Sequence, residues 1–162
     1  MGKQKGAAGT LATTALDRAK MSYELHAYEH DPQADSYGLE AAASLGRRPD
    51  EVFKTLIVDT GAGLAVAVVP VDRQLDLKAT ATALGVKRVS MAEPGVAERS
   101  SGMVVGGISP VGQRKLLPTV LDSSMRSLPT VLVSGGRRGL DVELDPDDLA
   151  HLTRAMFAPI AR

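Results

Sequence analysis

The chain has 162 residues, of which 44% are hydrophobic and 23% charged, and nineteen basic residues balance nineteen acidic ones. This length fits one domain that can bury a real hydrophobic core, and the composition is typical of a globular protein. The absence of cysteine excludes disulfides, thiolate metal ligands and a cysteine nucleophile. The sequence also lacks a long apolar run and a secretory leader, so we expect a cytoplasmic protein without membrane contact.

The balanced net charge hides a local excess of basic residues. Residues 101–140 carry five basic side chains and one acidic side chain, which gives this segment a charge of +4. An excess of this size is typical of a solvated face, and it would also suit weak contact with nucleic acid.

The order of the expected elements indicates the fold class. We expect a disordered tail at residues 1–10 and one domain over residues 11–162. The patterns predict helices over 11–20, 37–45 (capped by Ser36 and ended by Gly46), 75–84, 92–99 (interrupted at Pro94) and from Asp145 onward, and strands over 23–28, 52–59, 64–70, 87–90, 120–122 and 130–133. Because strands and helices do not alternate strictly, we expect an α/β (α+β) fold: a single compact domain with a mixed sheet flanked by helices.

Two glycine-rich segments are candidates for binding a ligand. Residues 106–115 begin with paired glycines, which let backbone N–H groups approach a ligand closely, and Ser109, Arg114 and Lys115 add polar groups. This chemistry suits a carboxylate, carbonyl or phosphate oxygen, but the glycine spacing matches neither a P-loop nor a dinucleotide fingerprint. A second pair at residues 135–136 follows an apolar strand. The two glycine pairs either line the same cleft or form two separate surface turns.

Lys54 stands inside an apolar strand segment, between Val52-Phe53 and Leu56-Ile57-Val58. Burying an ammonium group is costly unless it has a partner or a role. Lys54 is therefore either a cation held in a cleft, where it would stabilise a developing oxyanion, or an exposed lysine on the solvent face of a half-buried strand.

Metal and serine chemistry find little support in the sequence. His26 and His30 share one face of an expected strand but would lie about 13 Å apart at roughly 3.3 Å per residue, so one metal ion cannot join them. No G-x-S-x-G elbow is present. We expect neither a metal nor another cofactor.

Several motifs together resemble the YbaK/EbsC family. They include the strand motif Val52-Phe53-Lys54-Thr55-Leu56, the loop Gly106-Gly107-Ile108-Ser109-Pro110, and the segment from Ser134 to Asp141. The resemblance extends over about residues 21–160, which is nearly the whole expected domain.

The resemblance implies a fold and a reaction. Members of the family are similar to the editing domain inserted in bacterial prolyl-tRNA synthetases, which implies a compact α/β domain around a mixed, barrel-like sheet. The implied activity is trans-editing, namely hydrolysis of cysteine mischarged onto proline tRNA. Editing is needed because a synthetic site cannot strongly reject a smaller or isosteric amino acid by binding alone.

The resemblance also implies roles for individual residues. Lys54 would hold the aminoacyl ester or the terminal adenosine, and Gly106 and Gly107 would contact the scissile carbonyl, so these three are the candidate catalytic residues. The candidate substrate-binding residues are Tyr28, Tyr37, Thr55, Ile108, Ser109, Pro110, Ser134 and Asp141.

The implied mechanism needs no protein nucleophile. The substrate's own thiol would attack its ester and release tRNA and a cyclic thiolactone, while the protein positions the ester and stabilises the oxyanion. The expected partner is the 3′ end of aminoacyl-tRNA, with prolyl-tRNA synthetase as a second candidate, and a monomer is slightly favoured over an oligomer. Two alternatives remain: a deacylase for another small amino acid, such as alanine on proline tRNA, and a non-catalytic module that binds tRNA ends or nucleotides.

Overall fold

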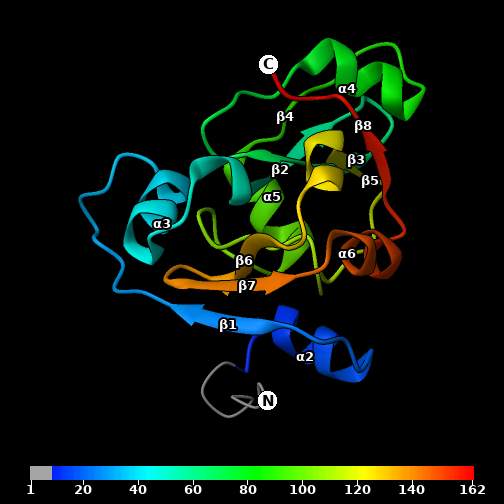
Figure 1. Cartoon of the computed structure of the whole chain (residues 1–162). Coiled ribbons are helices and arrows are strands. Elements are labelled where there is room, and N and C mark those ends of the chain that lie inside the picture. Colours follow the sequence, from blue (N-terminus) through cyan, green and yellow to red (C-terminus); the bar gives the residue numbers. More distant parts are fainter. Residues whose placement is uncertain (1–8) are drawn as a thin grey trace.

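The structure is a computed structural model that describes residues 9–162 (Figure 1). In chain order the elements are α2 (Leu11–Arg18), β1 (Glu24–Ala27), α3 (Tyr37–Leu45), η1 (Pro49–Glu51), β2 (Phe53–Asp59), β3 (Leu64–Pro70), α4 (Leu77–Leu84), β4 (Ser90–Met91), α5 (Pro94–Ser101), β5 (Thr119–Asp122), η2 (Ser123–Ser127), β6 (Val131–Arg137), β7 (Leu140–Leu144), α6 (Pro146–Thr153) and β8 (Met156–Ala158). None of the helices in residues 9–162 has the length and apolar character that a membrane span requires.

Two sheets form the framework of the domain. Strands β1, β7 and β6 make an antiparallel sheet. The second sheet has the order β4-β2-β3-β5-β8 and is mixed, because β5 runs parallel to both β3 and β8 while β2 is antiparallel to its neighbours. The expected mixed α/β domain is confirmed. Its sheets meet at a bridge between Val52 and Leu132, and within the described residues they do not close into a barrel.

The main core lies between the two sheets and is almost entirely aliphatic, since only 3% of the residues are aromatic. Phe53 and Ile57 of β2 pack with Val133 of β6 and Val142 of β7, and Ala97 brings α5 into the same cluster. Figure 1 shows α5 near the centre of the view, between the sheets. A smaller cluster places Ala41 and Ala42 of α3 on Val52 and Leu132, at the junction of the sheets. Helix α3 therefore covers that junction.

Local signals placed several helix ends correctly. The Ser36 hydroxyl accepts a hydrogen bond from the Leu39 amide at 3.2 Å, and Gly46 ends α3 with a φ of +66°. Asp145 caps α6 by accepting from the Asp147 amide at 2.7 Å. Of the expected tail, residues 1–8 lie outside the described residues, while Thr10 caps α2.

The segment before the first glycine loop differs from the expectation. The short strand is Ser90–Met91 rather than residues 87–90, and α5 begins at Pro94 instead of being interrupted there. The reason is that proline suits the first turn of a helix, where its missing N–H group would have no partner.

The second glycine pair lies in a strand. Strand β6 continues through Ser134, Gly135 and Gly136, with a bulge after Ser134, and the chain then turns into β7. Gly136 has a φ of +102°, which this bulge requires and which other residues rarely adopt. The sequence patterns predicted neither β7 nor β8.

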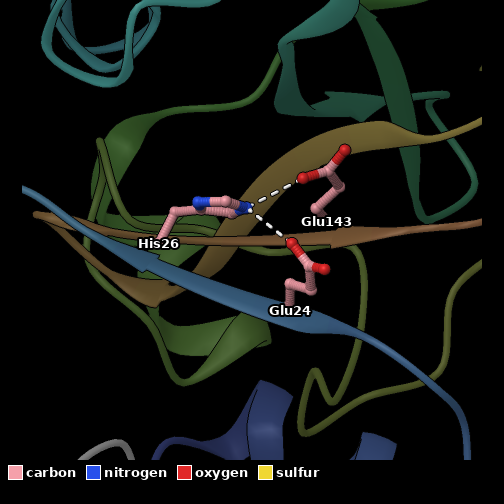
Figure 2. Close-up of side chains that lie close together, drawn as sticks. All are labelled: Glu24, His26 and Glu143. Carbon is pink, nitrogen blue, oxygen red and sulfur yellow. Dashed lines mark hydrogen bonds and ion pairs between the residues drawn. The ribbon is translucent and has the colours of Figure 1, made fainter. Parts of the chain in front are cut away.

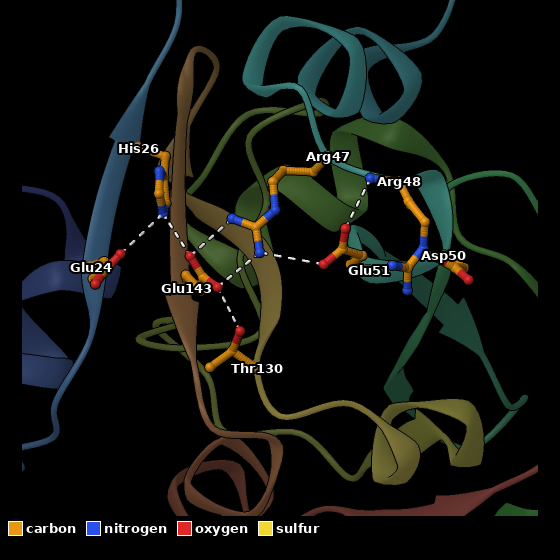
Figure 3. Close-up of polar contacts among 8 residues, drawn as sticks. All are labelled: Glu24, His26, Arg47, Arg48, Asp50, Glu51, Thr130 and Glu143. Atoms are coloured by element: carbon orange, nitrogen blue, oxygen red, sulfur yellow. Dashed lines mark hydrogen bonds and ion pairs between the residues drawn. The ribbon is translucent and has the colours of Figure 1, made fainter.

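An ion-pair network ties β7 to the segment after α3 (Figure 3). Glu143 accepts two hydrogen bonds from Arg47, at 3.1 and 2.9 Å, and one from the Thr130 hydroxyl, and it lies 2.8 Å from His26 Nε2. The hydrogen bonds from Arg47 are the main reason that the pKa of Glu143 falls to about 2. Glu143 therefore stays ionised over most of the pH range in which proteins are stable.

The same network includes a group with metal-ligating side chains. Figure 2 shows Glu24 and Glu143 near the same nitrogen of His26, and one ligand atom from each lies within 4.8 Å of the others. Arg47 already donates to both oxygens of Glu143, so a cation at this place would have to displace a guanidinium. We therefore interpret the group as part of the ion-pair network.

We predict that Glu143→Gln destabilises the domain by about 1–3 kcal/mol, because the charge-assisted hydrogen bonds of Arg47, Thr130 and His26 are weakened or lost. Urea unfolding at pH 7 measures this change. Because folding lowers the pKa of Glu143, its contribution is full above the ordinary value of 4.5 and is lost as the pH falls towards 2, so the gap between the two proteins should narrow in acid. Glu24→Gln is the control: its side chain is 76% exposed and lies 3.7 Å from His26, so we expect less than about 0.5 kcal/mol. Equal losses for both variants would contradict the prediction.

Candidate active site

A cavity of about 400 Å³ opens beside the outer edge of β2. Strand β6 reaches this edge at Val52 and β4 reaches it at Val58, and within residues 9–162 no strand pairs with it between Phe53 and Leu56. The cavity occupies this gap and is roofed by the start of α3, the start of α5 and the loop at residues 105–108. Its volume falls in the range of small-molecule sites, about 300–1,000 Å³.

Eight of the eleven candidate site residues line this cavity. They are Tyr28, Tyr37, Lys54, Thr55, Gly106, Ile108, Ser134 and Asp141. They come from six separate parts of the chain, which the two sheets, α3 and the glycine-rich loop bring together.

Gly107, Ser109 and Pro110 do not line the cavity but shape the loop that does. The Gly107 amide donates to the Val104 carbonyl at 2.8 Å, and a Cβ on Gly107 would lie 2.6 Å from the backbone of Arg137 and Arg138. The two glycine-rich segments therefore pack against each other. Ser109 is fully buried, and its hydroxyl accepts from the Val111 amide at 3.2 Å. Pro110 lines a smaller hollow between the loop and α6.

Lys54 is half-buried and lines the cavity rather than an open solvent face. Within residues 9–162 no hydrogen bond or ion pair engages its ammonium group. Burial lowers the pKa of Lys54, and the negative charge of Asp72 partly opposes this effect. The strand thus presents a cation to the cavity without neutralising it by a direct partner.

Asp141 is the most deeply buried charged group of the cavity, with 5% of its surface exposed. It lies on the central strand β7, opposite Ser134 of β6 and His26 of β1. In the described part of the chain its carboxylate has neither a hydrogen bond nor an ion pair, and burial raises its pKa to about 7. Burial and the nearby charge of Asp141 also raise the pKa of Tyr28 to about 12, so the Tyr28 phenol keeps its proton at neutral pH.

Thr55 contributes a third polar group without a partner. Its hydroxyl oxygen is buried and has no hydrogen bond within the described residues. Because side chains alternate along a strand, Lys54 and Thr55 leave β2 on opposite faces, and the cavity reaches both across the unpaired edge. A buried hydroxyl without a partner carries a free-energy penalty of about 1–3 kcal/mol, which a ligand's polar atom would relieve.

Two amides of the loop remain available as donors. In residues 9–162 no hydrogen bond engages the backbone N–H of Gly106 or of Ile108, and both residues line the cavity. Gly106 has a φ of +91°, and its backbone lies close to the Tyr37 ring. Backbone amides of this kind can stabilise a developing oxyanion.

Sequence reasoning missed the apolar wall of the cavity. Met91 and Ala92, together with Pro94 and Ala97 of α5, form this wall. The sequence pattern places the start of α5 wrongly. Only when the helix begins at Pro94 do Pro94 and Ala97 lie one helical turn apart and face the cavity together.

The basic excess of residues 101–140 does not form one patch. Arg138 lies over the Tyr37 ring beside the cavity, Lys115 lines the hollow near α6, and Arg126 lies over the ring of Phe157. The net charge of this segment is therefore distributed over separate parts of the surface.

A family model and a curated protein that match this chain both concern the editing of aminoacyl-tRNA. The model of the aminoacyl-tRNA editing domain matches residues 31–152. A curated protein of Enterococcus faecalis, EbsC, named as a candidate Cys-tRNA(Pro)/Cys-tRNA(Cys) deacylase, is 36% identical over 162 residues, which cover 99% of this chain and 98% of that protein.

Solved structures share the fold. The crystal structure of a candidate trans-editing enzyme for prolyl-tRNA synthetase superposes with a TM-score of 0.84 at 24% identity, covering 94% of this chain and 95% of that one. A hypothetical protein also gives 0.84, at 27% identity, covering 94% and 99% of the two chains. Because the family model spans most of the chain and EbsC aligns along nearly all of it, the chain belongs to the aminoacyl-tRNA editing domain family.

Proposed function

We propose that the protein is an aminoacyl-tRNA deacylase that hydrolyses mischarged Cys-tRNA(Pro) in trans. The observation that carries the proposal is a cavity lined by Lys54, Asp141 and Thr55, whose ammonium, carboxyl and hydroxyl groups have no hydrogen-bond or ion-pair partner within residues 9–162. Buried polar groups normally have partners, so an unpaired set in one cavity indicates a polar ligand. An aminoacyl ester offers an ammonium, a carbonyl and ribose hydroxyls within a few bonds.

Asp141 is the group that we assign to the α-ammonium of the aminoacyl substrate. A carboxyl group whose pKa lies near 7 is only partly ionised in the empty cavity. An ammonium placed beside it would favour the ionised form and lower its pKa. Binding of the amine and ionisation of Asp141 are therefore coupled, and an amino acid with a free amine is preferred over a blocked one.

Lys54 and the free loop amides are the groups that we assign to the ester carbonyl. When the carbonyl carbon is attacked, its oxygen becomes negative, and a cation or an N–H donor stabilises that charge more than it stabilises the ground state. The ammonium of Lys54 comes from β2, while the amides of Gly106 and Ile108 come from the loop above it. The ester would lie between these two walls.

The reacting nucleophile in this proposal is the thiol of the substrate. Its sulfur bonds to the ester carbonyl carbon, the bond from that carbon to the ribose oxygen breaks, and the thiol proton passes to the departing oxygen. The products are tRNA and a cyclic thiolactone, which water then opens. Ser109 and Ser134 instead accept hydrogen bonds from backbone amides, and in residues 9–162 no serine hydroxyl is hydrogen-bonded to a histidine.

The proposed macromolecular partner is the 3′ end of aminoacyl-tRNA. The cavity has room for the aminoacyl group and part of the terminal nucleoside, so the rest of the tRNA would lie outside it. The dispersed basic residues favour weak contact with the tRNA body, and a synthetase would then supply the missing tRNA selectivity.

The substrate test compares ester loss from Cys-tRNA(Pro), Ala-tRNA(Pro) and Ser-tRNA(Pro). We expect cysteine to be released fastest, because only it carries a thiol in reach of its own ester.

Replacing Lys54 by methionine should lower kcat by about 10²–10³-fold, the usual effect of removing one oxyanion donor. Serine released as fast as cysteine would contradict the thiol mechanism, and faster release of alanine would assign the cavity to alanine editing. Binding of all three without turnover would leave a non-catalytic module.

We predict a pH effect of Asp141→Asn on stability. Folding raises the pKa of Asp141 from 3.8 to about 7, so its contribution is full below pH 4 and is lost as the pH rises through 7. The loss amounts to about 4 kcal/mol at most. Asparagine does not titrate, so between pH 4 and 7.5 the wild type should lose stability relative to the variant in urea unfolding. Parallel curves for the two proteins would contradict the burial of an unpaired carboxylate.

We predict that Thr55→Val separates activity from stability. Valine removes the unpartnered hydroxyl, so the free energy of unfolding should stay equal or rise by up to about 1 kcal/mol, while deacylation should slow about 10-fold. Thr55→Ser should retain activity. Thr80→Val is the matched control: Thr80 is also buried, but its hydroxyl donates to the Asp76 carbonyl at 2.7 Å, so this variant should lose stability and keep its activity. Full activity of Thr55→Val would exclude a ligand contact.

A further inference from the structure

Val105, the first residue of the loop that lines the cavity, is held through both its amide and its carbonyl. The Val105 amide donates to Glu98 Oε2 of α5 at 2.8 Å. The Val105 carbonyl accepts from Arg138 Nε, in the turn between β6 and β7, also at 2.8 Å. Val105 and the following Gly106 both line the cavity, so these two charged side chains fix the position of its roof.

Arg138 makes a second contact, with a residue of α3 that also lines the cavity. Its guanidinium carbon lies 4.8 Å from the centroid of the Tyr37 ring, at the start of α3. The same ring lies against Gly106, where a Cβ would approach ring atoms to 2.8 Å. Arg138 therefore contacts two parts of the cavity lining, the loop through Val105 and α3 through Tyr37.

The Tyr37 ring is itself held in place. The His30 ring lies 5.7 Å from it, centroid to centroid, at an interplanar angle of 35°. His30 Nδ1 lies 2.9 Å from Glu40 of α3, and the same Glu40 carboxylate accepts from the Asp31 amide. The Tyr37 ring thus packs against His30, Gly106 and Arg138, and it is called the Tyr37 platform below.

We propose that Arg138 is a positioning residue for the deacylation reaction: it holds the Val105–Gly106 peptide against the Tyr37 platform, so that the Gly106 amide stays where the oxyanion forms. This inference rests on the proposed function. The side chain acts through the loop and need not touch the substrate. Arginine suits the task because its planar guanidinium can stack on a ring while Nε–H donates in the same plane, which lysine cannot reproduce.

The neighbouring Arg137 provides a charge-matched control. Arg137 is exposed, and within residues 9–162 its side chain makes one hydrogen bond, to the Arg138 carbonyl at 3.3 Å. Arg137→Ala and Arg138→Ala remove the same charge from neighbouring positions, but only the second removes the contacts with Val105 and Tyr37. A role in attracting tRNA would affect both variants and would weaken at high salt.

The experiment measures kcat and KM for Cys-tRNA(Pro) together with amide hydrogen exchange over residues 105–108. For Arg138→Ala we expect kcat to fall by about 10–100-fold with a smaller change in KM, since misplacement of a catalytic group by about 1 Å can cost a factor of this size. Amide exchange at Val105 and Gly107, whose N–H groups are hydrogen-bonded in the wild type, should become faster. Arg138→Lys should recover little of the activity, and Arg137→Ala should match the wild type within about twofold.

Each outcome decides the proposal. Unchanged exchange in Arg138→Ala, or faster exchange with unchanged kcat, would overturn it. Equal, salt-dependent losses in Arg137→Ala and Arg138→Ala would overturn it in favour of an electrostatic contact with tRNA. A wild-type protein without deacylase activity would refute the proposed function instead, and the exchange data would still show whether Arg138 holds the loop.

Discussion

Two carboxylates face the same side of β7, two residues apart, and the rest of the site depends on their opposite environments. Glu143 accepts from Arg47 and Thr130 and lies beside His26, and its pKa falls to about 2. Asp141 is buried without any such partner among the described residues, and its pKa rises to about 7. The hydrogen bonds at Glu143 connect β1, β7 and the segment after α3, on the same strand that carries the second carboxylate.

The proposed chemistry divides the work between rigid and irregular backbone. Lys54, Thr55 and Asp141 stand on strands, whose pairing fixes their positions. The free amides of Gly106 and Ile108 stand on a loop, and that loop needs side chains from two other elements, Glu98 and Arg138, to hold it. In such a site the protein contributes geometry and charge, and the substrate contributes the reactive atom. The absence of cysteine from the sequence is compatible with this division, because the thiol arrives with the ligand.

The sequence predicted those parts of the fold that depend on neighbouring residues. Ser36 and Asp145 cap helices because a side chain within three residues of the helix start can reach its free amides. Strand β7 escaped prediction because Leu140 to Leu144 gains its identity from pairing with β1 and β6, far away in the chain. Pro94 was read as an interruption, whereas it is the first residue of α5.

For the candidate site, too, the sequence predicted which residues take part but not the contacts that they make. The family resemblance named eleven residues, and eight of them line one cavity. No sequence pattern indicated the surroundings of these side chains. Among the described residues Lys54 has no direct partner and the buried Thr55 hydroxyl has no hydrogen bond, while Arg138 contacts both the loop and α3. These properties arise from distances between segments that are remote in sequence.

The gap along the edge of β2 has a consequence for how such a domain can diversify. Lys54, Thr55 and Asp141 line the cavity from the sheets, while part of its apolar lining comes from β4 and α5, and α3 adds Ala41. Larger or smaller side chains at Met91, Ala92 or Ala97 would reshape the space around an amino-acid side chain without breaking a ladder of strand hydrogen bonds. In the proposed reaction, one scaffold could therefore acquire a new amino-acid preference through substitutions in this apolar lining while Lys54, Thr55 and Asp141 stay in place.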